Sequence, residues 1–274
     1  MTIVYPPSFA PGLDILSCRD GHGFDPHLHE GYVLWLNSEA GEQFSVRGHS
    51  DILQPGSISL IEPGVVHSNQ PCDPSRRHLR SFYFGSEFLD ALAGRMVEGD
   101  GLPLLRPGVC RDARLTARLE RLHEHLLPQP GGVPPESAEE DVLAVFAELF
   151  ARTAGLSVPT EPTAKDWRLH RVETYLRDTL DRPVRLAVLA ELAGCTEFHL
   201  IRLFRRHKGM SPHAYHLQLR LEHARHLLEQ GHPISVAAQM AGMCDQSHLT
   251  RAFHRRYGLT PGEYAAQRGS RGKG

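Results

Sequence analysis

The chain has 274 residues, of which 41% are hydrophobic and 23% charged, which is enough for two domains that each bury a core. The formal net charge of −2 conceals an uneven distribution, because residues 165–274 carry 18 Lys and Arg against 10 Asp and Glu, whereas the first 164 residues carry 12 against 22. The five cysteines are scattered without paired spacing, which argues against a disulfide-rich secreted protein. The sequence has no long apolar run and no N-terminal segment in which charged residues precede an apolar stretch, which argues against a membrane span and a signal peptide. We therefore expect a cytoplasmic protein.

The first 85 residues contain short runs of β-forming residues that are broken by glycine and proline. The clearest runs are Gly31–Asn37, Glu42–Val46 and Ser57–Ile61. Their spacing predicts a compact antiparallel barrel or sandwich. The run Tyr32–Leu36 is apolar throughout, so alternation cannot tell which of its faces points inward.

Helices are predicted to follow this β-rich part. They cover Ser86–Val97, Asp112–Leu127 and Glu139–Ala154, and the second is amphipathic, with leucines at helical spacing. A proline- and glycine-rich break at Pro128–Pro135 separates the last two. A second proline-containing stretch, at residues 156–165, is interpreted as a linker between domains.

The sequence from Leu186 onward predicts a helix, a glycine turn and a second helix. The first helix is Leu186–Ala193, and Gly194 ends it. Thr196 is positioned to cap the second helix, Glu197–Lys208. After Gly209, a Ser-Pro pair opens a long connecting helix that runs to about Gln230.

The same pattern then repeats. Ser235 is expected to cap Val236–Ala241, and Asp245 is expected to cap Gln246–Tyr257. A Thr-Pro pair at Thr260 opens the last helix.

Aligning the two units on Phe204 and Phe253 gives eight identities in seventeen positions. The identical residues are His199, Leu200, Arg202, Phe204, Arg206, Gly209, Pro212 and Tyr215, which match His248, Leu249, Arg251, Phe253, Arg255, Gly258, Pro261 and Tyr264. A helix, a glycine turn and a second helix in this order are typical of helix-turn-helix DNA-binding domains. A connecting helix of roughly 20 residues spans about 30 Å. Because one turn of B-DNA is about 34 Å, both second helices could face consecutive major grooves.

This region, Leu186–Tyr264, resembles the double helix-turn-helix domain of the AraC/XylS family of bacterial transcription regulators. The run Asp245–Phe253, followed by Gly258-Leu259-Thr260-Pro261, is close to the family signature, whereas Met243 stands where an aromatic residue is usual. The resemblance implies transcription regulation by sequence-specific DNA binding, with activation the more common outcome in the family.

The resemblance also implies which side chains contact DNA. They are Phe198, His199, Ile201, Arg202, Arg205 and Arg206 in the first unit and Gln246, Ser247, His248, Thr250, Arg251 and Arg255 in the second. Arg202 and Arg251 suit guanine, and Gln246 suits adenine. In the alternative interpretation, Arg205, Arg206, Arg255 and Arg256 contact only phosphates, and His199 and His248 are ordinary surface histidines.

Two histidine-containing segments, Pro26–His29 and Glu62–Asn69, carry a second resemblance. They are similar to the cupin-like ligand-binding domain at the front of many AraC-type regulators, which implies effector binding in the barrel. The candidate effector-binding residues are His27, His29, Trp35, His67, Asn69 and Tyr83. The alternative is that the histidines are polar barrel-lining or turn residues.

A cupin-type metal-dependent enzyme is a hypothesis of another class. In catalytic cupins a His-x-His pair, a following glutamate and a later histidine hold a metal, but here Val33 and Leu34 stand where the carboxylate is expected. Three histidines alone can bind zinc, yet regulator domains of this type generally act without metal. We therefore expect no catalytic residue, no cofactor and no metal.

The expected fold has two domains: an N-terminal all-β cupin-like barrel with packed helices, and a C-terminal all-α domain of two helix-turn-helix subdomains joined by a long helix. The expected boundaries are 1–155 for effector binding and dimerisation, 156–165 for the linker, 166–268 for DNA binding and 269–274 for a disordered tail. The expected partners are double-stranded DNA at promoter half-sites, a small-molecule effector, a second copy of the chain in a homodimer, and RNA polymerase. A barrel that only dimerises or binds a protein partner is the remaining hypothesis. The effector and the operator cannot be identified from the sequence.

Overall fold

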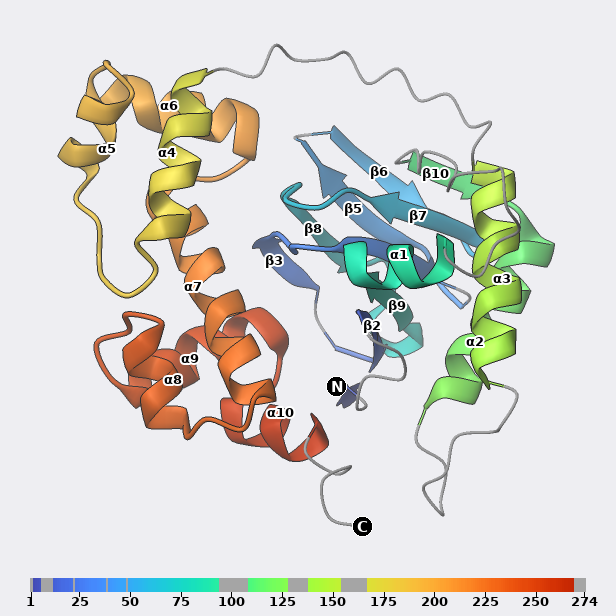
Figure 1. Cartoon of the computed structure of the whole chain (residues 1–274). Helices are drawn as coiled ribbons and strands as arrows, with labels where there is room; N and C mark the ends of the chain where they lie inside the picture. The colour runs from blue at the N-terminus through green and yellow to red at the C-terminus, as the bar shows by residue number, and fades with distance from the viewer. Residues whose placement is uncertain are drawn as a thin grey trace.

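A computed structural model describes residues 2–5, 12–21, 23–37, 39–47, 49–93, 108–127, 138–153 and 167–268. These residues form a β-rich N-terminal domain and a helical C-terminal domain that lie side by side (Figure 1). The predicted break at 128–135, the linker at 156–165 and the tail at 269–274 lie outside the described residues. None of the described helices is long and apolar enough to cross a membrane.

The described strands of the N-terminal domain form two antiparallel sheets, not one closed barrel. The first sheet has the order β1 (Thr2–Val4), β2 (Leu13–Arg19), β9 (His78–Phe84), β4 (Tyr32–Asn37), β7 (Ser57–Ile61) and β10 (Gly108–Arg111). The second has the order β3 (Phe24–His27), β8 (His67–Pro71), β5 (Glu42–Val46) and β6 (His49–Leu53). The three predicted strands are therefore confirmed, and β4 begins one residue later than expected.

Strand β4 is buried on both faces, which explains why its sequence does not alternate. Val33 and Trp35 belong to an apolar cluster that reaches the C-terminal domain. Leu34 and Leu36 belong to a different cluster, on the opposite face.

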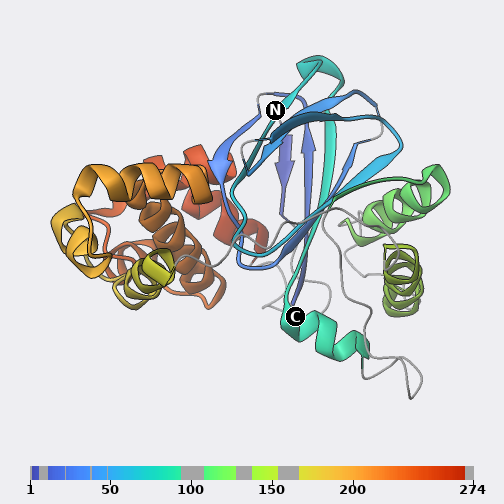
Figure 2. The ribbon, with the colours of Figure 1, turned by 90° about the horizontal axis from the view of Figure 1, so that it is seen from above.

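The predicted helices α1 (Ser86–Ala93), α2 (Ala113–Leu126) and α3 (Ala138–Thr153) share that second cluster with the six-stranded sheet. Asp112 caps α2 by accepting a hydrogen bond from the Leu115 backbone N–H at 3.0 Å. Figure 2 shows α2 and α3 on the side of the sheets that lies away from the C-terminal domain. The residues beyond Ala93 in the first predicted helix lie outside the described part of the chain.

Helices α5 (Leu186–Leu192) and α6 (Glu197–Lys208) form the first helix-turn-helix unit, and α8 (Ile234–Met240) and α9 (Gln246–Tyr257) form the second. The two units are joined by α7 (Pro212–Glu229) and followed by α10 (Pro261–Arg268). An additional helix, α4 (Trp167–Asp178), packs on the first unit and was not predicted. Its buried Leu169, Val172 and Leu176 do have helical spacing.

The two units repeat the same packing and capping. The Phe204 and Tyr215 rings lie 5.8 Å apart, and the equivalent Phe253 and Tyr264 rings lie 5.5 Å apart. Thr196 and Asp245 cap α6 and α9 as predicted. The predicted Ser235 cap is wrong, because α8 begins at Ile234 directly after a proline and no side chain caps it.

Candidate nucleic-acid interface and effector pocket

Helices α6 and α9 each present a polar surface on the C-terminal domain. Of the twelve predicted DNA-contacting residues, eight are exposed, and His199, Ile201, His248 and Thr250 are partly buried. The Arg202 guanidinium lies over the exposed Phe198 ring, 5.3 Å from its centre, which holds both side chains on the same turn of α6. Ile201 lines a cavity of about 180 Å³ together with Leu189 and Pro212, so it also contributes to packing within the first unit.

Arg256, at the end of α9, is buried against the N-terminal domain. It is only 6% exposed. Its Nη2 donates to the Leu28 carbonyl at 3.1 Å, lies 3.1 Å from His29 Nε2, and lies 3.5 Å from Glu222 Oε1. In this structure Arg256 therefore joins α9 to the N-terminal domain, and a phosphate contact would require Arg256 to leave this position.

Three of the predicted effector-binding residues, His27, His29 and His67, lie together. His27 and His67 are direct partners across the β3–β8 pair, which places both imidazoles on one face. The ring centres of His27 and His67 lie 4.3 Å apart, and the His29 ring lies 5.2 Å and 5.4 Å from them.

Burial controls the protonation of these imidazoles. It lowers the pKa of His67 to about 3, and the positive charge of Arg256 acts in the same direction. Burial and the Arg256 charge also hold the pKa values of His27 and His29 well below the usual value. The three rings are therefore neutral near pH 7, and each has one nitrogen lone pair that can accept a hydrogen bond or bind a metal ion.

The other predicted effector-binding residues divide between two environments. The Trp35 ring lies 5.1 Å from that of His67, and the Tyr83 ring lies 4.6 Å from that of His29. Asn69 belongs instead to a buried polar network, in which its amide donates to Glu42 at 2.5 Å and Arg77 donates to Glu42 at 2.9 Å. Burial raises the pKa of Tyr83 to about 12, so its phenol stays protonated.

A cavity of about 350 Å³ lies between the two domains. His29 and Tyr83 are the only predicted effector-binding residues among the described residues that line it. The rest of its polar and aromatic lining was not predicted from the sequence, and it includes Tyr5, Asp14, Glu222, Arg225, Tyr257 and Arg268. The charged residues of α7 resemble an ordinary surface pattern at i, i+3 and i+4, so no sequence signal distinguishes them.

Charged groups close one side of this cavity. Asp14 accepts a hydrogen bond from Arg268 at 2.8 Å and lies 3.7 Å from Arg225. Glu229 lies 2.6 Å from Arg225 and 3.2 Å from Arg268. Asp14 is therefore the N-terminal domain's contribution to an ion-pair network that otherwise belongs to the DNA-binding domain.

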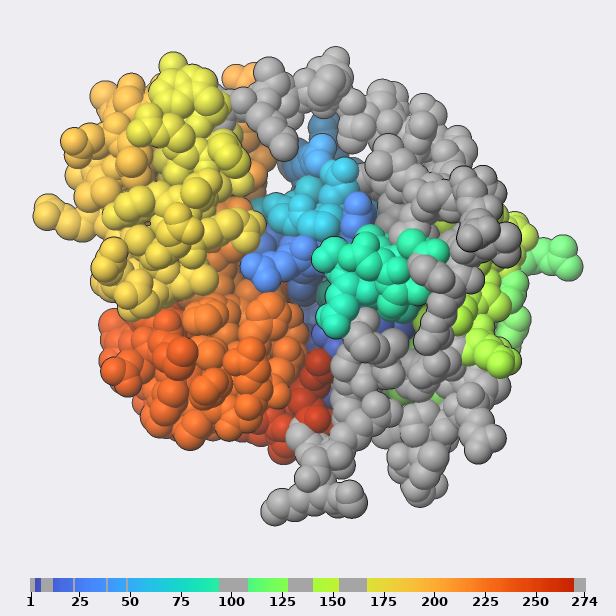
Figure 3. Space-filling model, viewed as in Figure 1, coloured from blue at the N-terminus to red at the C-terminus, as the bar shows by residue number. Residues whose placement is uncertain are grey.

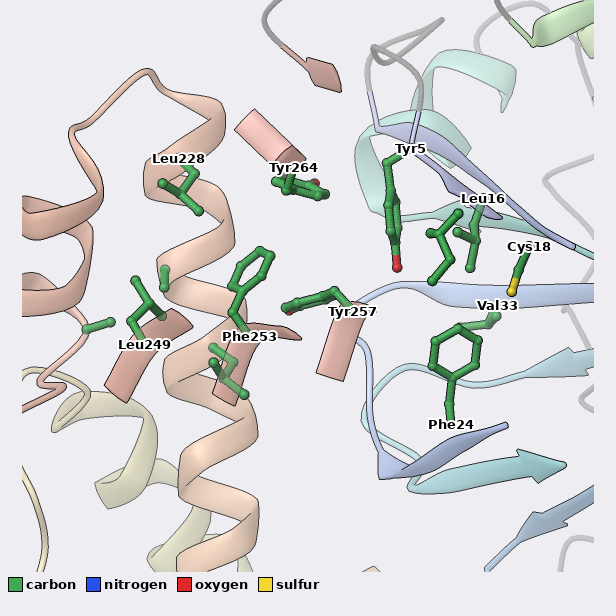
Figure 4. Packing of buried hydrophobic residues seen from close by; sticks show 14 of the residues in the cluster. Tyr5, Leu16, Cys18, Phe24, Val33, Leu228, Leu249, Phe253, Tyr257 and Tyr264 are labelled. Atoms are coloured by element: carbon green, nitrogen blue, oxygen red, sulfur yellow. The ribbon is translucent and has the colours of Figure 1, made fainter. Parts of the chain in front are cut away.

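An aromatic contact closes another side. Tyr5 extends from the N-terminal domain toward Tyr257 and Tyr264, and its ring lies 6.4 Å and 5.2 Å from theirs (Figure 4). The Tyr5 backbone N–H donates to Gln267 Oε1 at 2.8 Å. Both domains therefore contribute to one apolar cluster, which also contains Phe253. In the space-filling view, the second unit lies below the first along one side of the molecule (Figure 3).

Part of the DNA-facing surface of α9 also lies beside strand β3. His248, Arg251 and Arg255 line a groove of about 250 Å³ together with Asp25 and Pro26. A carboxylate and a β-strand therefore border the arginines that are predicted to contact DNA.

A helix-turn-helix pair on a long helix, beside a β-rich domain with a cavity, defines the class of ligand-responsive DNA-binding regulators. A family profile described as an AraC-like ligand binding domain matches residues 12–152, and one described as a helix-turn-helix domain matches residues 189–267. The chain belongs to the AraC family of transcription regulators. It has a ligand-binding domain and a helix-turn-helix domain, as the sequence predicted.

Individual relatives agree with this assignment. The chain is 28% identical over 224 residues to an uncharacterized HTH-type transcriptional regulator, YbfI of Bacillus subtilis, and the match covers 81% of this chain and 80% of that protein. Its fold is similar to that of apo ToxT from Vibrio cholerae, with a TM-score of 0.59 at 11% identity over 95% of this chain and 99% of the other. An unsaturated fatty acid-bound ToxT gives a TM-score of 0.55 at 12% identity over 97% and 94%.

Proposed function

We propose that this regulator is an activator whose second helix-turn-helix unit is restrained by the N-terminal domain until an effector binds. The observation that carries the proposal is the burial of Arg256, a residue of α9, against Leu28 and His29. DNA binding and effector binding then favour the same domain arrangement, in which this contact is open, and the effector shifts a pre-existing equilibrium toward it.

In the DNA-bound arrangement, the exposed faces of α6 and α9 read two successive major-groove segments. Arg202 and Arg251 contact guanine and Gln246 contacts adenine, while Arg205, Arg206 and Arg255 contact the backbone. The 18 residues of α7 correspond to about 27 Å of helix, which is comparable with the ~34 Å of one DNA turn.

The effector is a small molecule with an anionic group, bound in the cavity between the domains. Arg225 and Arg268 supply the positive charge, and the rings of Tyr83 and Tyr257 supply apolar walls. An anionic effector would compete with Asp14 for Arg225 and Arg268, and this competition would loosen the contact between the domains. The fatty acid in ToxT is an anionic ligand of this general kind.

The assembly that we propose is a cytoplasmic homodimer, formed through the N-terminal domain, that contacts RNA polymerase at the promoter. Two protomers on adjacent half-sites would bind more tightly than one protomer, because the second contact is effectively intramolecular. A domain that binds only a protein partner would give no effector-dependent stabilisation.

The first experiment is selection of bound DNA from a random library with the purified full chain, followed by sequencing. We expect enrichment of a motif with two half-elements about one helical turn apart. The neighbouring genes of genomic matches would then supply candidate effectors.

Enrichment of a half-element for only one helix-turn-helix unit would mean that the other unit contacts the DNA backbone without reading bases. Salt-sensitive binding with no enriched motif, repeated in the presence of a cell extract that contains small molecules, would contradict sequence-specific recognition.

A further inference from the structure

Three histidines of the N-terminal domain, of which His27 and His67 are buried, lie in an arrangement that suits a metal ion. One ring nitrogen from each of His27, His29 and His67 lies within 4.8 Å of the others. Zn²⁺ bonds nitrogen at about 2.0–2.1 Å, so tetrahedral ligands are roughly 3.3 Å apart. Side-chain rotations that move the ring nitrogens by roughly 1–1.5 Å would therefore bring all three within bonding distance of one ion.

Hydrogen bonds already orient two of these rings. The Nδ1–H groups of His27 and His67 donate to the carbonyls of Asp25 at 2.6 Å and Val65 at 2.8 Å. This pattern leaves both Nε2 atoms as lone-pair donors, as in protein metal sites where a carbonyl fixes the ligand tautomer. His67 Nε2 is buried and has no hydrogen-bond partner among the described residues.

The third histidine is occupied by a group from the other domain. Arginine can only donate hydrogen bonds, and Arg256 Nη2 lies 3.1 Å from His29 Nε2 and 3.3 Å from His29 Nδ1, so it uses the lone pair of this ring. His29 Nδ1 also lies 3.7 Å from Glu222 Oε1, so a carboxylate lies beside this ring. A metal ion at the His29 ring and the Arg256 guanidinium would need the same nitrogen lone pair, and two positive charges would also repel each other.

We propose that His27, His29 and His67 form a binding site for a zinc-like divalent metal ion, and that metal binding and the Arg256 contact exclude each other. The carboxylate ligand whose absence led us to expect no metal is not required, since three imidazoles and one solvent molecule complete a tetrahedral site. Occupation by metal releases α9 from the N-terminal domain. This inference goes beyond the proposed function, because it concerns metal binding without DNA or effector.

The test uses the full-length chain, stripped of metal with a chelator. Zn²⁺ is titrated in competition with a chromophoric chelator, and Co²⁺ is titrated by absorption, where intense visible bands indicate a four-coordinate site. We expect one ion per chain in the unmodified protein. His67→Gln should lose this binding, whereas the matched variant of an exposed strand histidine, His49→Gln, should keep it.

Arg256→Gln provides the second arm, because it leaves all three ligands in place. Removing the competing guanidinium should tighten Zn²⁺ binding by about tenfold. The neighbouring exposed Arg255→Gln is the control and should not change Zn²⁺ affinity.

By reciprocity, Zn²⁺ should make the contact between the domains more accessible to a protease, and this gain should be absent in Arg256→Gln. Equal stoichiometry in His67→Gln and the unmodified chain would overturn the site, and unchanged affinity in Arg256→Gln would overturn the mutual exclusion. If His67→Gln does not fold, as judged by circular dichroism, the Arg256→Gln comparison still decides the proposal.

Discussion

The carboxylate of Asp14 in β2 lies 2.8 Å from the guanidinium of Arg268 at the end of α10, although 254 residues separate them. Both side chains are largely shielded, with exposed fractions of 26% and 11%. A charge-assisted hydrogen bond in such a position contributes about 1.5–3 kcal/mol. It therefore influences how firmly the second DNA-binding unit is held.

Asp14→Asn should raise DNA affinity in the absence of effector. The substitution keeps the shape of the side chain but removes its charge, so the arrangement in which α9 is free becomes more populated. We expect up to about a tenfold gain, measured by fluorescence anisotropy with a selected DNA site. Asp90→Asn, at an exposed position of α1, is the control. Equal affinities for the two variants would show that the Asp14 contact does not restrain DNA binding.

Arg202→Ala and Arg251→Ala should each weaken binding to the selected site by about 1–3 kcal/mol and relax the preference at one base pair. Arg205→Ala should weaken binding about equally on all sequences and reduce the salt dependence by about one counterion. The measurement is binding to a panel of single-base variants at two salt concentrations. Uniform weakening by Arg202→Ala and Arg251→Ala would assign them to the phosphates.

Phe204→Ala should cost about 3–5 kcal/mol of unfolding free energy, because this ring is fully buried against Tyr215. Phe198→Ala, six residues earlier on the same helix, removes a side chain that is 69% exposed and should change stability by less than about 0.5 kcal/mol. Denaturant titration followed by circular dichroism measures both values. A large stability loss in Phe198→Ala would mean that this ring packs in the protein and is not available to DNA.

Acid should destabilise the N-terminal domain through His123. Burial lowers the pKa of this residue to about 4, and the Arg80 charge acts in the same direction. An unfolded histidine has a pKa near 6.5. Between these values the unfolded chain takes up a proton that the folded chain does not, so stability is complete above pH ~6.5 and falls toward pH ~4.

Protonation of His123 in the unfolded chain is expected to lower the unfolding free energy by up to about 1.4 kcal/mol for each pH unit between these pKa values. His123→Gln keeps an N–H group that can donate to the Leu16 carbonyl, and it should flatten the pH dependence of the unfolding free energy by about one proton. His125→Gln, at an exposed position on the same helix, is the matched control. Identical pH slopes for both variants would exclude His123 as the titrating group.

The helical domain could be predicted closely from the sequence because its signals are local. Thr196, Asp245 and Ser211 cap helices within three residues, and Gly209 and Gly258 adopt the left-handed conformation that ends α6 and α9. Ser235 misled the prediction, since a proline two residues earlier already sets the start of α8.

The contact between the domains could not be predicted, because it depends on pairs that are distant in the sequence. Arg256 meets His29 across 227 residues, and Tyr5 meets Gln267 across 262. A single sequence contains no signal for such pairs, and a buried arginine on α9 has the same residue type as its DNA-facing neighbours. The histidine cluster was recognised as a group, but its connection to α9 was not.

The shared apolar cluster around Tyr5, Tyr257 and Tyr264 has a consequence for genetics. Substitutions that disturb the packing of the N-terminal domain also alter how the second DNA-binding unit is held. A screen for regulators that are active without inducer should therefore recover changes at Tyr5 and its neighbours, far from any DNA-contacting helix. Mutations that cause a constitutive phenotype would then map to the residue that directly follows strand β1.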